Sequence, residues 1–560
     1  MYVLGIGGLG YKDSAAALLD DGRPIAAVSE ARFTGIKHEG GWPHRAVRYC
    51  LDHAGISLRE VAGVAVANNP WLPMREKVLK WYGEGFFRSR TASVYHVFKD
   101  EGHRLVEFLQ IMEELRGQEV RVETVRHMAS HMAAAFYTSP FDRAALLCID
   151  GRGEMSSSGI GRGVGNKLEF NPPCRMPDSL GLLYALVADY LGYSELDDEF
   201  RLVSISPTGT PSYVEKMRDL VSVAGDGSYT LNPDYFGYHQ GRAYLSERFT
   251  EVFGPHADPD LPLEDRHRDI AASLHAVVLD VVMRLAQLAR EQSGEKNLCL
   301  TGGLATNWGL VGAVCEAGIF DSTYVPPAPG DDGTALGAAL QLWHDLLGQP
   351  RVAPLFRADL GPAFSEEEIR LELERLKLHA TKPADLAEAA AERIASGETV
   401  GWFQGRAEFG PRALGHRSML ANPTDPSTRA RLVASVKARS EFHPFGLSVA
   451  AEAVPELFQS AQPSPFLERT ARLTDDARRR LPAVASPSGV TRLHTVDAQR
   501  APLFHQLLTA VGAKTGVPAV VNTSLNEPGR PTATTPREAI GSLYTTGLDA
   551  LALGPFLLAK

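Results

Sequence analysis

The chain has 560 residues, of which 44% are hydrophobic and 22% charged, the composition of a globular protein with two to four domains. Its formal net charge of −10 argues against a nucleic-acid-binding protein, which would normally carry a basic face. The five cysteines are scattered without a C-x-x-C pair, which excludes a zinc cage or disulfide framework and indicates a reducing compartment.

The start of the chain and its apolar stretches bear on location. Residues 1–21 lack the basic head and long apolar run of a signal peptide. No apolar run approaches the roughly 18–20 residues that a membrane span needs. We therefore expect a soluble, cytoplasmic protein that binds neither membranes nor nucleic acids.

The first residues predict strands joined by a tight turn. Residues 2–7 and 14–20 are apolar runs typical of strands. Asp21 and Gly22 then mark the tip of a hairpin, and a third strand is expected over 25–32.

A helix is expected over 43–55, because Pro43 suits its first turn and Gly55 suits the position just past its end. Residues 61–69 predict another strand. The following segment, 71–118, is rich in aromatic residues and arginine and has a helical pattern. Its aromatic side chains either pack between helices or line the mouth of a substrate pocket.

The strand–turn–strand pattern then recurs. Residues 143–150 predict a strand, followed by a glycine-containing turn and a return strand. Helices are expected over 180–192 and 268–293, residues 296–307 predict a strand, a double glycine and a helix start, and 325–347 predict a loop and a helix. This recurrence predicts a duplicated α/β domain whose glycines cluster where backbone amides can meet nucleotide phosphates.

The segment 348–380 has the character of a domain boundary. It is interrupted by prolines and contains a polar helix with Ser365 as its cap and Glu368 three residues later. A second α/β region is expected from residue 381 onward.

His127 and His131 are the first candidate functional residues. Four residues apart, they project from one face of a helix. Asp150 ends a predicted strand, where open α/β sheets collect ligands. Two imidazoles and a carboxylate suit iron, zinc or manganese. The alternatives are core or surface histidines, with Asp150 capping a turn or contacting magnesium.

Two glycine-rich segments are candidates for nucleotide binding. Gly302 and Gly303 allow the backbone to approach a phosphate or ribose, although a plain tight turn explains them equally well. Asp331 and Asp332 stand beside glycines at a helix start, where a capping carboxylate is the ordinary interpretation.

Residues 401–440 contain seven Lys or Arg against two acids, a local excess of positive charge in an acidic chain. Several of these arginines alternate with apolar residues, and arginine in an apolar setting favours a bound phosphate or carboxylate. The alternative is a structural ion-pair cluster with Glu408 and Glu441. Asn522, Ser524 and Asn526 follow a predicted strand and either bind a small polar group or satisfy their own turn.

Together these segments resemble the O-carbamoyltransferases of natural-product and nodulation-factor biosynthesis. The resemblance covers nearly the whole chain, and its most specific motif is "QGRAEFGPRALGHRS" at 404–418. Further motifs are "DSAAALLDDG", "ARFTGIKHEGGWP", "HMASH", "DGRGE", "RHRDIAAS", "LCLTGGLATN", "PGDDGTALGAAL", "VKARSEF" and "NTSLN".

The resemblance implies two domains and a shared reaction. Residues 1–352 would form a duplicated actin/hexokinase-like (ribonuclease H-like) domain, 353–380 a linker, and 381–560 a YrdC-like α/β domain. The second domain would form carbamoyl-AMP from carbamoyl phosphate and ATP. The first would transfer the carbamoyl group to a hydroxyl of a small natural product.

The resemblance also implies roles for individual residues. One divalent transition ion, Fe²⁺ or another, would be held by His127, His131, Asp150 and Asp331, and Mg²⁺ would accompany ATP. Lys12, Asp13 and Lys37 would act near the carbamoyl group. Binding of nucleotide and carbamoyl phosphate would fall to Gly151, Gly153, Gly302, Gly303, Asn307, Arg406, Arg412, Arg417, Lys437, Arg439, Arg492, Asn522 and Ser524.

Four positions depart from the family pattern: Lys12 stands where a histidine is usual, and Ser204, His443 and Pro528 also differ. They leave open a diverged nucleotide-binding or regulatory homologue without turnover. A sugar kinase or ATPase on the same superfold is a further alternative, although it needs no YrdC-like partner. A homodimer is usual in the family, and the sequence does not disclose the acceptor.

Overall fold

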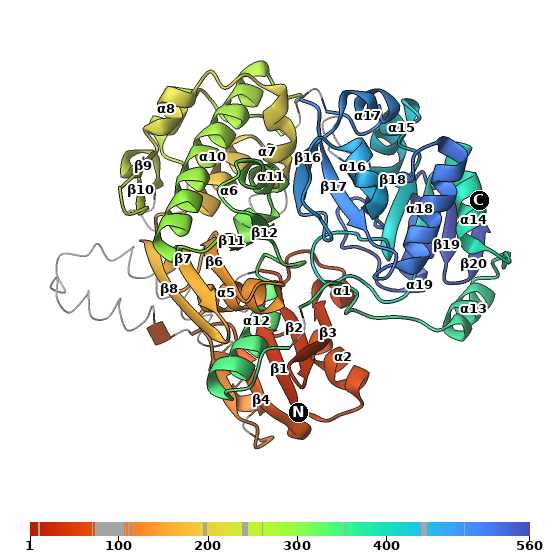
Figure 1. Ribbon diagram of the computed structural model, residues 1–560, viewed down its shortest axis with the longest axis horizontal. Helices are drawn as coiled ribbons and strands as arrows, with labels where there is room; N and C mark the ends of the chain where they lie inside the picture. The colour runs from red at the N-terminus through yellow and green to blue at the C-terminus, as the bar shows by residue number, and fades with distance from the viewer. Residues whose placement is uncertain are drawn as a thin grey trace. The chain divides into compact units, whose positions relative to one another are not determined.

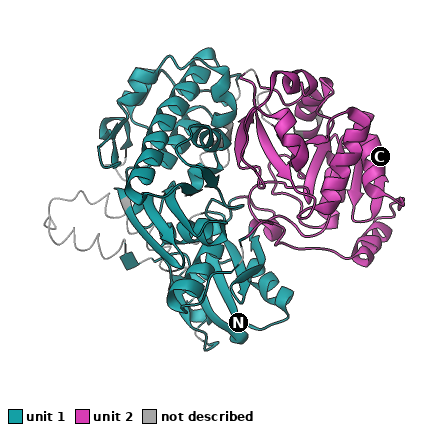
Figure 2. Cartoon of the chain, viewed as in Figure 1, with its two compact units in different colours: residues 1–30, 38–354 teal, residues 31–37, 355–560 magenta. Residues whose placement is uncertain are grey.

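The computed structural model describes residues 1–8, 12–69, 71–72, 106, 108–109, 112–115, 117–193, 199–237, 245–259, 261–352, 354–437, 445–486 and 488–560. These residues form two compact units (Figure 2). The first comprises 1–30 and 38–354, and the second comprises 31–37 and 355–560. Residues 355–380, expected as part of a linker, therefore belong to the second unit, as do residues 31–37, which were expected in the first domain.

The first sheet of unit 1 has the strand order β3-β2-β1-β4-β5. Its strands β1, β2 and β3 are antiparallel, whereas β4 runs parallel to β1 and β5 parallel to β4. The bounds are β1 Tyr2–Gly7, β2 Ala15–Asp20, β3 Arg23–Ser29, β4 Val61–Val66 and β5 Val122–Thr124.

The second sheet of unit 1 repeats this arrangement in the order β12-β11-β6-β7-β8. Here β6, β7 and β8 are antiparallel, and β11 and β12 add in parallel beside β6. The bounds are β6 Arg143–Ile149, β7 Ser156–Val164, β8 Lys167–Arg175, β11 Asn297–Thr301 and β12 Ser322–Tyr324. The same topology occurs twice, which confirms the expected duplicated α/β domain.

Two helices, α5 (His127–Thr138) and α12 (Gly333–Gln341), lie close together in unit 1 (Figure 1). A side chain at Gly337 of α12 would fall 1.8 Å from the carbonyl oxygen of Ser130, so the two helix backbones are in direct contact. Gly5 of β1 meets Ala335 in the same way. Small residues thus allow α12 to pack against both a strand and the helix that carries the two histidines.

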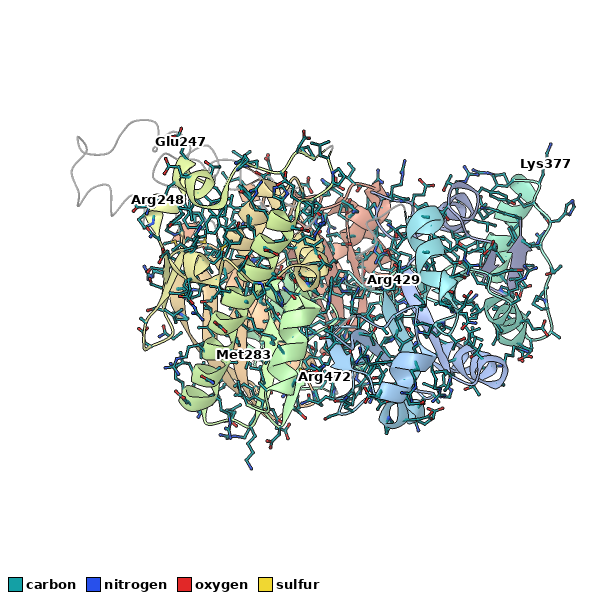
Figure 3. All side chains as sticks on the ribbon, turned by 90° about the horizontal axis from the view of Figure 1, so that it is seen from above. Glu247, Arg248, Met283, Lys377, Arg429 and Arg472 are labelled. Atoms are coloured by element: carbon teal, nitrogen blue, oxygen red, sulfur yellow. The ribbon has the colours of Figure 1, made fainter. Side chains whose placement is uncertain are left out.

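The other helices of unit 1 surround the two sheets. The long α10 covers the second sheet and forms its core together with α6 and α11 (Figure 1). Charged side chains such as Glu247 and Arg248 of α9 lie at the surface (Figure 3). The bounds are α2 His44–Ala54, α6 Leu180–Tyr190, α7 Glu199–Ile205, α8 Val214–Arg218, α9 Glu247–Phe253, α10 Asp265–Ser293 and α11 Trp308–Glu316; a small hairpin contains β9 Val221–Val223 and β10 Tyr229–Leu231.

Unit 2 is an eight-stranded mixed sheet with the order β16-β17-β15-β18-β14-β13-β19-β20. The strands are β13 Val400–Phe403, β14 Arg417–Ala421, β15 Gly446–Ala450, β16 Arg469–Arg472, β17 Val490–Val496, β18 Ala519–Ser524, β19 Ala550–Leu553 and β20 Phe556–Ala559. The helices are α1 Ala31–Thr34, α13 Glu366–Arg375, α14 Leu386–Ala395, α15 Ser427–Arg431, α16 Val454–Leu457, α17 Asp475–Arg480, α18 Pro502–Thr515 and α19 Pro536–Thr545. An α/β architecture was expected here, and its kinship with the YrdC fold stays a prediction.

Several sequence-based element predictions hold and others shift. The helix expected over 43–55 is α2, which ends at Gly55 in the left-handed conformation. The expected capping box at Ser365 is present at the start of α13. The third strand ends at Ser29, because the chain turns into α1. Most of 71–118 lies outside the described residues.

Residues 31–37 are tied into unit 2 by the side chain of Arg32. Its guanidinium donates to the carbonyl oxygens of Thr532, Glu408 and Gly410. In the described part of the chain, no helix is both long and apolar enough to span a membrane.

Candidate metal centre and adjoining sites

The two histidines of α5 lie in a helix that is buried on every side. All twelve residues of α5 are buried, and His127 and His131 are 0% and 1% exposed. A buried imidazole needs a polar partner, because an apolar surrounding offers nothing to its nitrogen atoms. The partners are Asp150, directly after β6, and Asp331, in the loop before α12.

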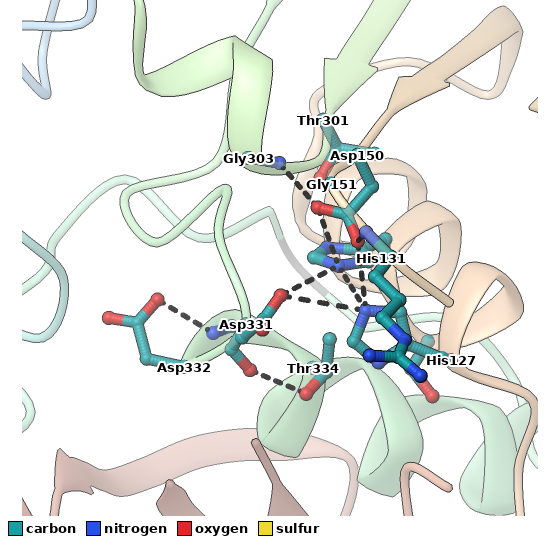
Figure 4. A network of polar contacts seen from close by, with 12 residues as sticks. His127, His131, Asp150, Gly151, Thr301, Gly303, Asp331, Asp332 and Thr334 are labelled. Atoms are coloured by element: carbon teal, nitrogen blue, oxygen red, sulfur yellow. Dashed lines mark hydrogen bonds and ion pairs between the residues drawn. The ribbon is translucent and has the colours of Figure 1, made fainter. Parts of the chain in front are cut away.

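The four predicted ligands converge on one point (Figure 4). His127 Nε2 lies 3.0 Å from His131 Nε2 and 3.2 Å from Asp150 Oδ2, and each Nε2 lies 3.5 Å from Asp331 Oδ1. The four candidate ligand atoms all lie within 4.8 Å of one another. The sequence spacing therefore placed both histidines on one face, and the fold adds the two carboxylates.

Two glycines, Gly302 and Gly303, lie beside Asp150. Gly302 has a φ of +91°, and a side chain there would collide with the carbonyl oxygen of Ile149. This conformation lets the Gly303 N–H donate to Asp150 Oδ1 at 2.8 Å. The double glycine expected beside a nucleotide thus has a visible role in fixing one oxygen of the Asp150 carboxylate.

In this cluster the imidazoles and the carboxylates stabilise each other's charges against the effect of burial. Burial opposes the charge of His127, but hydrogen bonds to Asp150 and Asp331 outweigh it and raise its pKa well above the usual value. Burial likewise opposes ionisation of Asp331, yet the two imidazoles hold its pKa well below its usual range. The carboxylates are therefore ionised and present negative charge to a shared centre.

This donor set fits a divalent transition ion. Two imidazole nitrogens and two carboxylate oxygens match the ligands of iron, manganese or zinc, and their convergence on one buried point is what an ion requires. His127 and His131 approach Nε2 to Nε2, so at most one of them can donate a hydrogen bond to the other. A cation at this point would accept lone pairs from both imidazoles and both carboxylates once it has displaced the proton of His127.

The predicted catalytic residues form a second group around a loop of unit 1. Asp13 lies between β1 and β2, and its carboxylate is 2.9 Å from Nδ1 of His38. Both residues have left-handed backbones, with φ of +60° for Asp13 and +51° for His38. Such conformations strain residues that have a side chain, and they cluster at functional sites. Lys12 precedes this pair, whereas Lys37 belongs to residues 31–37 of unit 2.

His38 was missed by the sequence interpretation. The motif "KHEGG" was noted, but only its lysine was assigned a role. Nothing local predicts that His38 faces Asp13, because the contact joins residues 25 positions apart. A histidine beside a glycine pair, within a segment already suspected of function, is the one signal that pointed to it.

The remaining predicted nucleotide residues of unit 1 lie in turns around the cluster. Gly151 and Gly153 belong to the loop between β6 and β7. Asn307 caps α11, where its side-chain oxygen accepts N–H bonds from Gly309 and Leu310 at 3.1 Å. Its visible bonds are therefore those of a helix cap, and adenosine binding by these residues stays a prediction.

In unit 2, two predicted anion-binding arginines contact backbone carbonyls. Arg417 is 0% exposed and donates to the carbonyl oxygens of four residues: Gln404, His416, Pro362 and Gly405. Its guanidinium also lies 3.6 Å from the ring centroid of Phe403. Arg406 donates to the carbonyl oxygens of Leu360 and Gly361. These contacts close the 404–417 loop and join it to residues 360–362, so structural roles for these two side chains are visible.

Glu408 organises the same loop. One of its carboxylate oxygens accepts the backbone N–H groups of Leu414, His416 and Arg417 at 2.8–3.0 Å. Burial opposes its charge, but His416, Arg417 and these N–H groups outweigh burial and lower the pKa of Glu408. Glu408 therefore has a structural role in the loop through backbone N–H groups, whereas Glu441, the other acid of the expected ion-pair cluster, lies outside the described residues.

The other basic residues are placed less fully. Arg412 is partly buried, and the loss of solvent around its guanidinium lowers its pKa to about 10. Arg492 is 6% exposed on β17 and pairs across the sheet with Gly446. Lys437 ends a π-helical turn, and Arg439 and His443 lie outside the described residues.

Asn522 is the best-defined polar group of unit 2. Its Nδ2 donates to the carbonyl oxygen of Ala413 at 3.0 Å and to Ser448 Oγ at 2.9 Å. Ser448 bonds His494 Nδ1 at 2.8 Å, and the backbone of Pro465 is the other partner of His494. Since proline has no N–H, His494 must donate to its carbonyl, Ser448 must donate to His494, and Asn522 must donate to Ser448.

This relay fixes the orientation of the Asn522 amide. Among the described residues, its buried Oδ1 has no hydrogen-bond donor. Ser524, in contrast, donates to Asn526 Oδ1 at 2.6 Å, so the end of the "NTSLN" motif satisfies its own turn. Asn522 therefore presents a free acceptor beside the 404–417 loop.

Comparisons with known proteins are consistent across the chain. Residues 2–340 match the family model described as carbamoyltransferase N-terminus, and residues 391–560 match that of the carbamoyltransferase C-terminus. An uncharacterized protein of Synechocystis sp. is 36% identical over all of this chain and 97% of its own length. Nodulation protein NolNO of Sinorhizobium fredii is 33% identical over 98% of this chain and 79% of its own length.

Component A of the (R)-2-hydroxyglutaryl-CoA dehydratase of Acidaminococcus fermentans is 19% identical, covers 61% of this chain and 96% of its own, and has a TM-score of 0.32.

Proposed function

The chain belongs to the carbamoyltransferase family, and we propose that it uses carbamoyl phosphate and ATP to carbamoylate a hydroxyl group of a small natural product. The two steps fall to different units. Unit 2 converts carbamoyl phosphate, ATP and one water into carbamoyl-AMP, phosphate and pyrophosphate. Unit 1 then joins the carbamoyl carbon to the acceptor oxygen and releases AMP and one proton.

The observation that carries this proposal is the family match of both units, with a four-ligand cluster in the first. His127, His131, Asp150 and Asp331 would hold a divalent transition ion, with iron as the first candidate. When bound, the ion supplies Lewis-acid stabilisation for phosphate charge beside the departing AMP. Buried, ionised carboxylates and converging imidazoles support this assignment.

Asn522 supports the proposed donor chemistry in unit 2. A carbamoyl group carries an NH₂, which needs hydrogen-bond acceptors when it is taken out of water. The fixed Oδ1 of Asn522 is such an acceptor, and the basic 404–417 loop beside it suits a phosphate.

The His38–Asp13 pair supports a base for the acceptor hydroxyl. An alcohol is a weak nucleophile, and its attack on an acyl group is assisted by a base that removes its proton. Asp13 holds Nδ1 of His38, and we assign removal of the proton to the other ring nitrogen, Nε2. The pair lies beside Lys12, which stands where a histidine is usual in the family.

The proposal is tested with the metal-loaded, full-length protein. Carbamoyl phosphate and ATP together should yield pyrophosphate and carbamoyl-AMP, detected by mass spectrometry, whereas omission of either should abolish both. Nucleotide binding without pyrophosphate release would overturn the proposed activity in favour of a binding or regulatory homologue. Transfer of the ATP γ-phosphate to a sugar would instead indicate a kinase.

A further inference from the structure

Glu154 connects three parts of unit 1 at the start of α5. Its Oε1 accepts the backbone N–H of His127 at 2.9 Å and that of Asn69 at 3.0 Å. Asn69 follows β4, His127 begins α5, and Glu154 belongs to the loop between β6 and β7. A single carboxylate oxygen therefore fixes the first residue of the metal-binding helix to two other segments.

The start of α5 depends on this carboxylate. The first N–H groups of a helix have no partner within the helix, and a capping side chain usually satisfies one of them. Arg126, which precedes α5, makes no such side-chain bond in the described structure. Glu154 takes this role from a distant position, and its negative charge also suits the positive end of the helix dipole.

The same loop holds His127 a second time. Asp150, at the start of the loop, lies 3.2 Å from Nε2 of His127 through its Oδ2. His127 is thus held at its backbone by Glu154 and at its ring by Asp150. The loop between them is itself fixed, since the Gly153 N–H donates to Ser156 at 3.0 Å and Ser179 Oγ donates to the Gly151 carbonyl at 2.6 Å.

We propose that Glu154 is a positioning residue of the metal centre, which sets metal affinity by fixing His127 relative to Asp150. This inference rests on the metal centre of the proposed function. Glu154 acts through the backbone, since Oε1 bonds N–H groups. Without the carboxylate, the first turn of α5 is less ordered. The His127 ring then loses more conformational entropy when an ion binds, which weakens binding. Partners that orient metal ligands typically contribute roughly 10- to 100-fold to affinity.

The test compares substitutions at Glu154 with a matched control in the full-length protein. Glu154→Ala removes the acceptor, whereas Glu154→Gln keeps an acceptor oxygen and removes the charge. The control is Glu538→Ala, because Glu538 Oε2 also accepts two backbone N–H groups, from Thr534 and Thr535, at the start of α19 in unit 2. Calorimetric titration with Mn²⁺ measures affinity, and urea unfolding of the metal-free protein measures stability.

We expect Glu154→Ala to weaken Mn²⁺ binding by roughly 10- to 100-fold, Glu154→Gln to recover most of that loss, and Glu538→Ala to bind as the wild type does. Wild-type affinity in Glu154→Ala would overturn the inference. So would an equal loss in Glu538→Ala, because the effect would then reflect general destabilisation. If Glu154→Ala does not fold, Glu154→Asp, whose shorter side chain falls short of both N–H groups, replaces it. Absence of Mn²⁺ binding by the wild type would instead overturn the metal centre itself.

Discussion

Asn522 donates a hydrogen bond to Ser448 Oγ across 2.9 Å, and this contact decides which way its amide points. Both partners of Nδ2 are acceptors, so the side-chain oxygen is directed away from them. The three side chains of the relay come from neighbouring strands β17, β15 and β18, which the sheet holds in register. The amide nitrogen of Asn522 is thus held by two hydrogen bonds, and its buried oxygen remains available to accept one.

The first prediction concerns recognition of the carbamoyl group. Asn522→Leu keeps the volume of the side chain and removes the acceptor, so kcat/KM for carbamoyl phosphate in pyrophosphate formation should fall by roughly 10- to 100-fold. Acetyl phosphate carries a methyl group in place of NH₂, and its use should fall far less. Steady-state pyrophosphate release with each donor measures the change.

The matched control for this substitution is Asn422→Leu. Asn422 follows β14 in the same sheet, and its side-chain oxygen bonds the N–H and hydroxyl of Thr424. It loses comparable hydrogen bonds without offering a free acceptor. Recognition of NH₂ by Asn522 would be contradicted if kcat/KM fell equally for carbamoyl phosphate and acetyl phosphate. It would also be contradicted if kcat/KM for carbamoyl phosphate fell equally in Asn422→Leu.

The second prediction concerns the stability of the relay in acid. Burial lowers the pKa of His494 to about 4, below the value near 6.5 of an unfolded histidine. Between these two pH values the unfolded chain binds a proton that the folded chain excludes, so stability falls as the pH drops below about 6.5. The loss attributable to this residue should reach about 2 kcal/mol at pH 5.

Amide hydrogen exchange in β15, β17 and β18 at pH 7 and pH 5, corrected for intrinsic rates, measures this change. His494→Gln should flatten the pH dependence, although its stability at pH 7 is lower because the relay is altered. The exposed His53 of α2 supplies the control substitution His53→Gln, which should leave the profile unchanged. A profile in His494→Gln that is as steep as in the wild type would show that other groups titrate.

The third prediction separates the two half-reactions through His38. His38→Asn should leave the first turnover of pyrophosphate within about twofold of the wild type, because the proposed function assigns this step to unit 2. Transfer to a probe alcohol, glycerol, should fall by roughly 100- to 10,000-fold, which is the usual contribution of a general base. Asp13→Asn should give an intermediate loss, since Asp13 holds the ring of His38 through Nδ1.

Quench-flow measurement of pyrophosphate and mass spectrometry of the glycerol carbamate give the two rates. His53→Asn again supplies a control on a surface imidazole. Equal transfer rates in His38→Asn and the wild type would remove His38 as the base, and a lost first turnover would indicate a structural role.

The sequence predicted those parts of the protein that depend on local spacing. Strands β1 to β4, β6 and β11, α2 with its Gly55 end, and the shared face of His127 and His131 follow from periodicity and caps. Asp331 was assigned through family resemblance, because nothing local distinguishes it from the capping residue Asp332 beside it. His38 and Glu154 act through contacts between distant segments, which residue spacing does not encode.

The arginine-rich loop shows the same limit in another form. An arginine in an apolar stretch indicates that some acceptor meets its guanidinium, and the sequence favoured a bound anion. For Arg417 the visible acceptors are carbonyl oxygens brought by loop closure, including that of Pro362, which lies 55 residues away. Every residue has a backbone carbonyl, so the sequence does not show whether an arginine will meet carbonyl oxygens of a loop or a bound anion. The fold is needed to distinguish the two.

The fourth prediction follows from this difference and concerns Arg417→Met. The substitution leaves four carbonyl oxygens without their buried donor, so unit 2 should lose about 3 kcal/mol or more of stability. The loss is measured by urea unfolding, with amide hydrogen exchange in β13 and β14 as the probe. Arg472→Met is the control, because the exposed Arg472 (Figure 3) donates to the Ser488 carbonyl at the surface, where water replaces it. A variant with wild-type stability that no longer forms pyrophosphate would reverse the interpretation, since the guanidinium would then serve the substrate and not the loop.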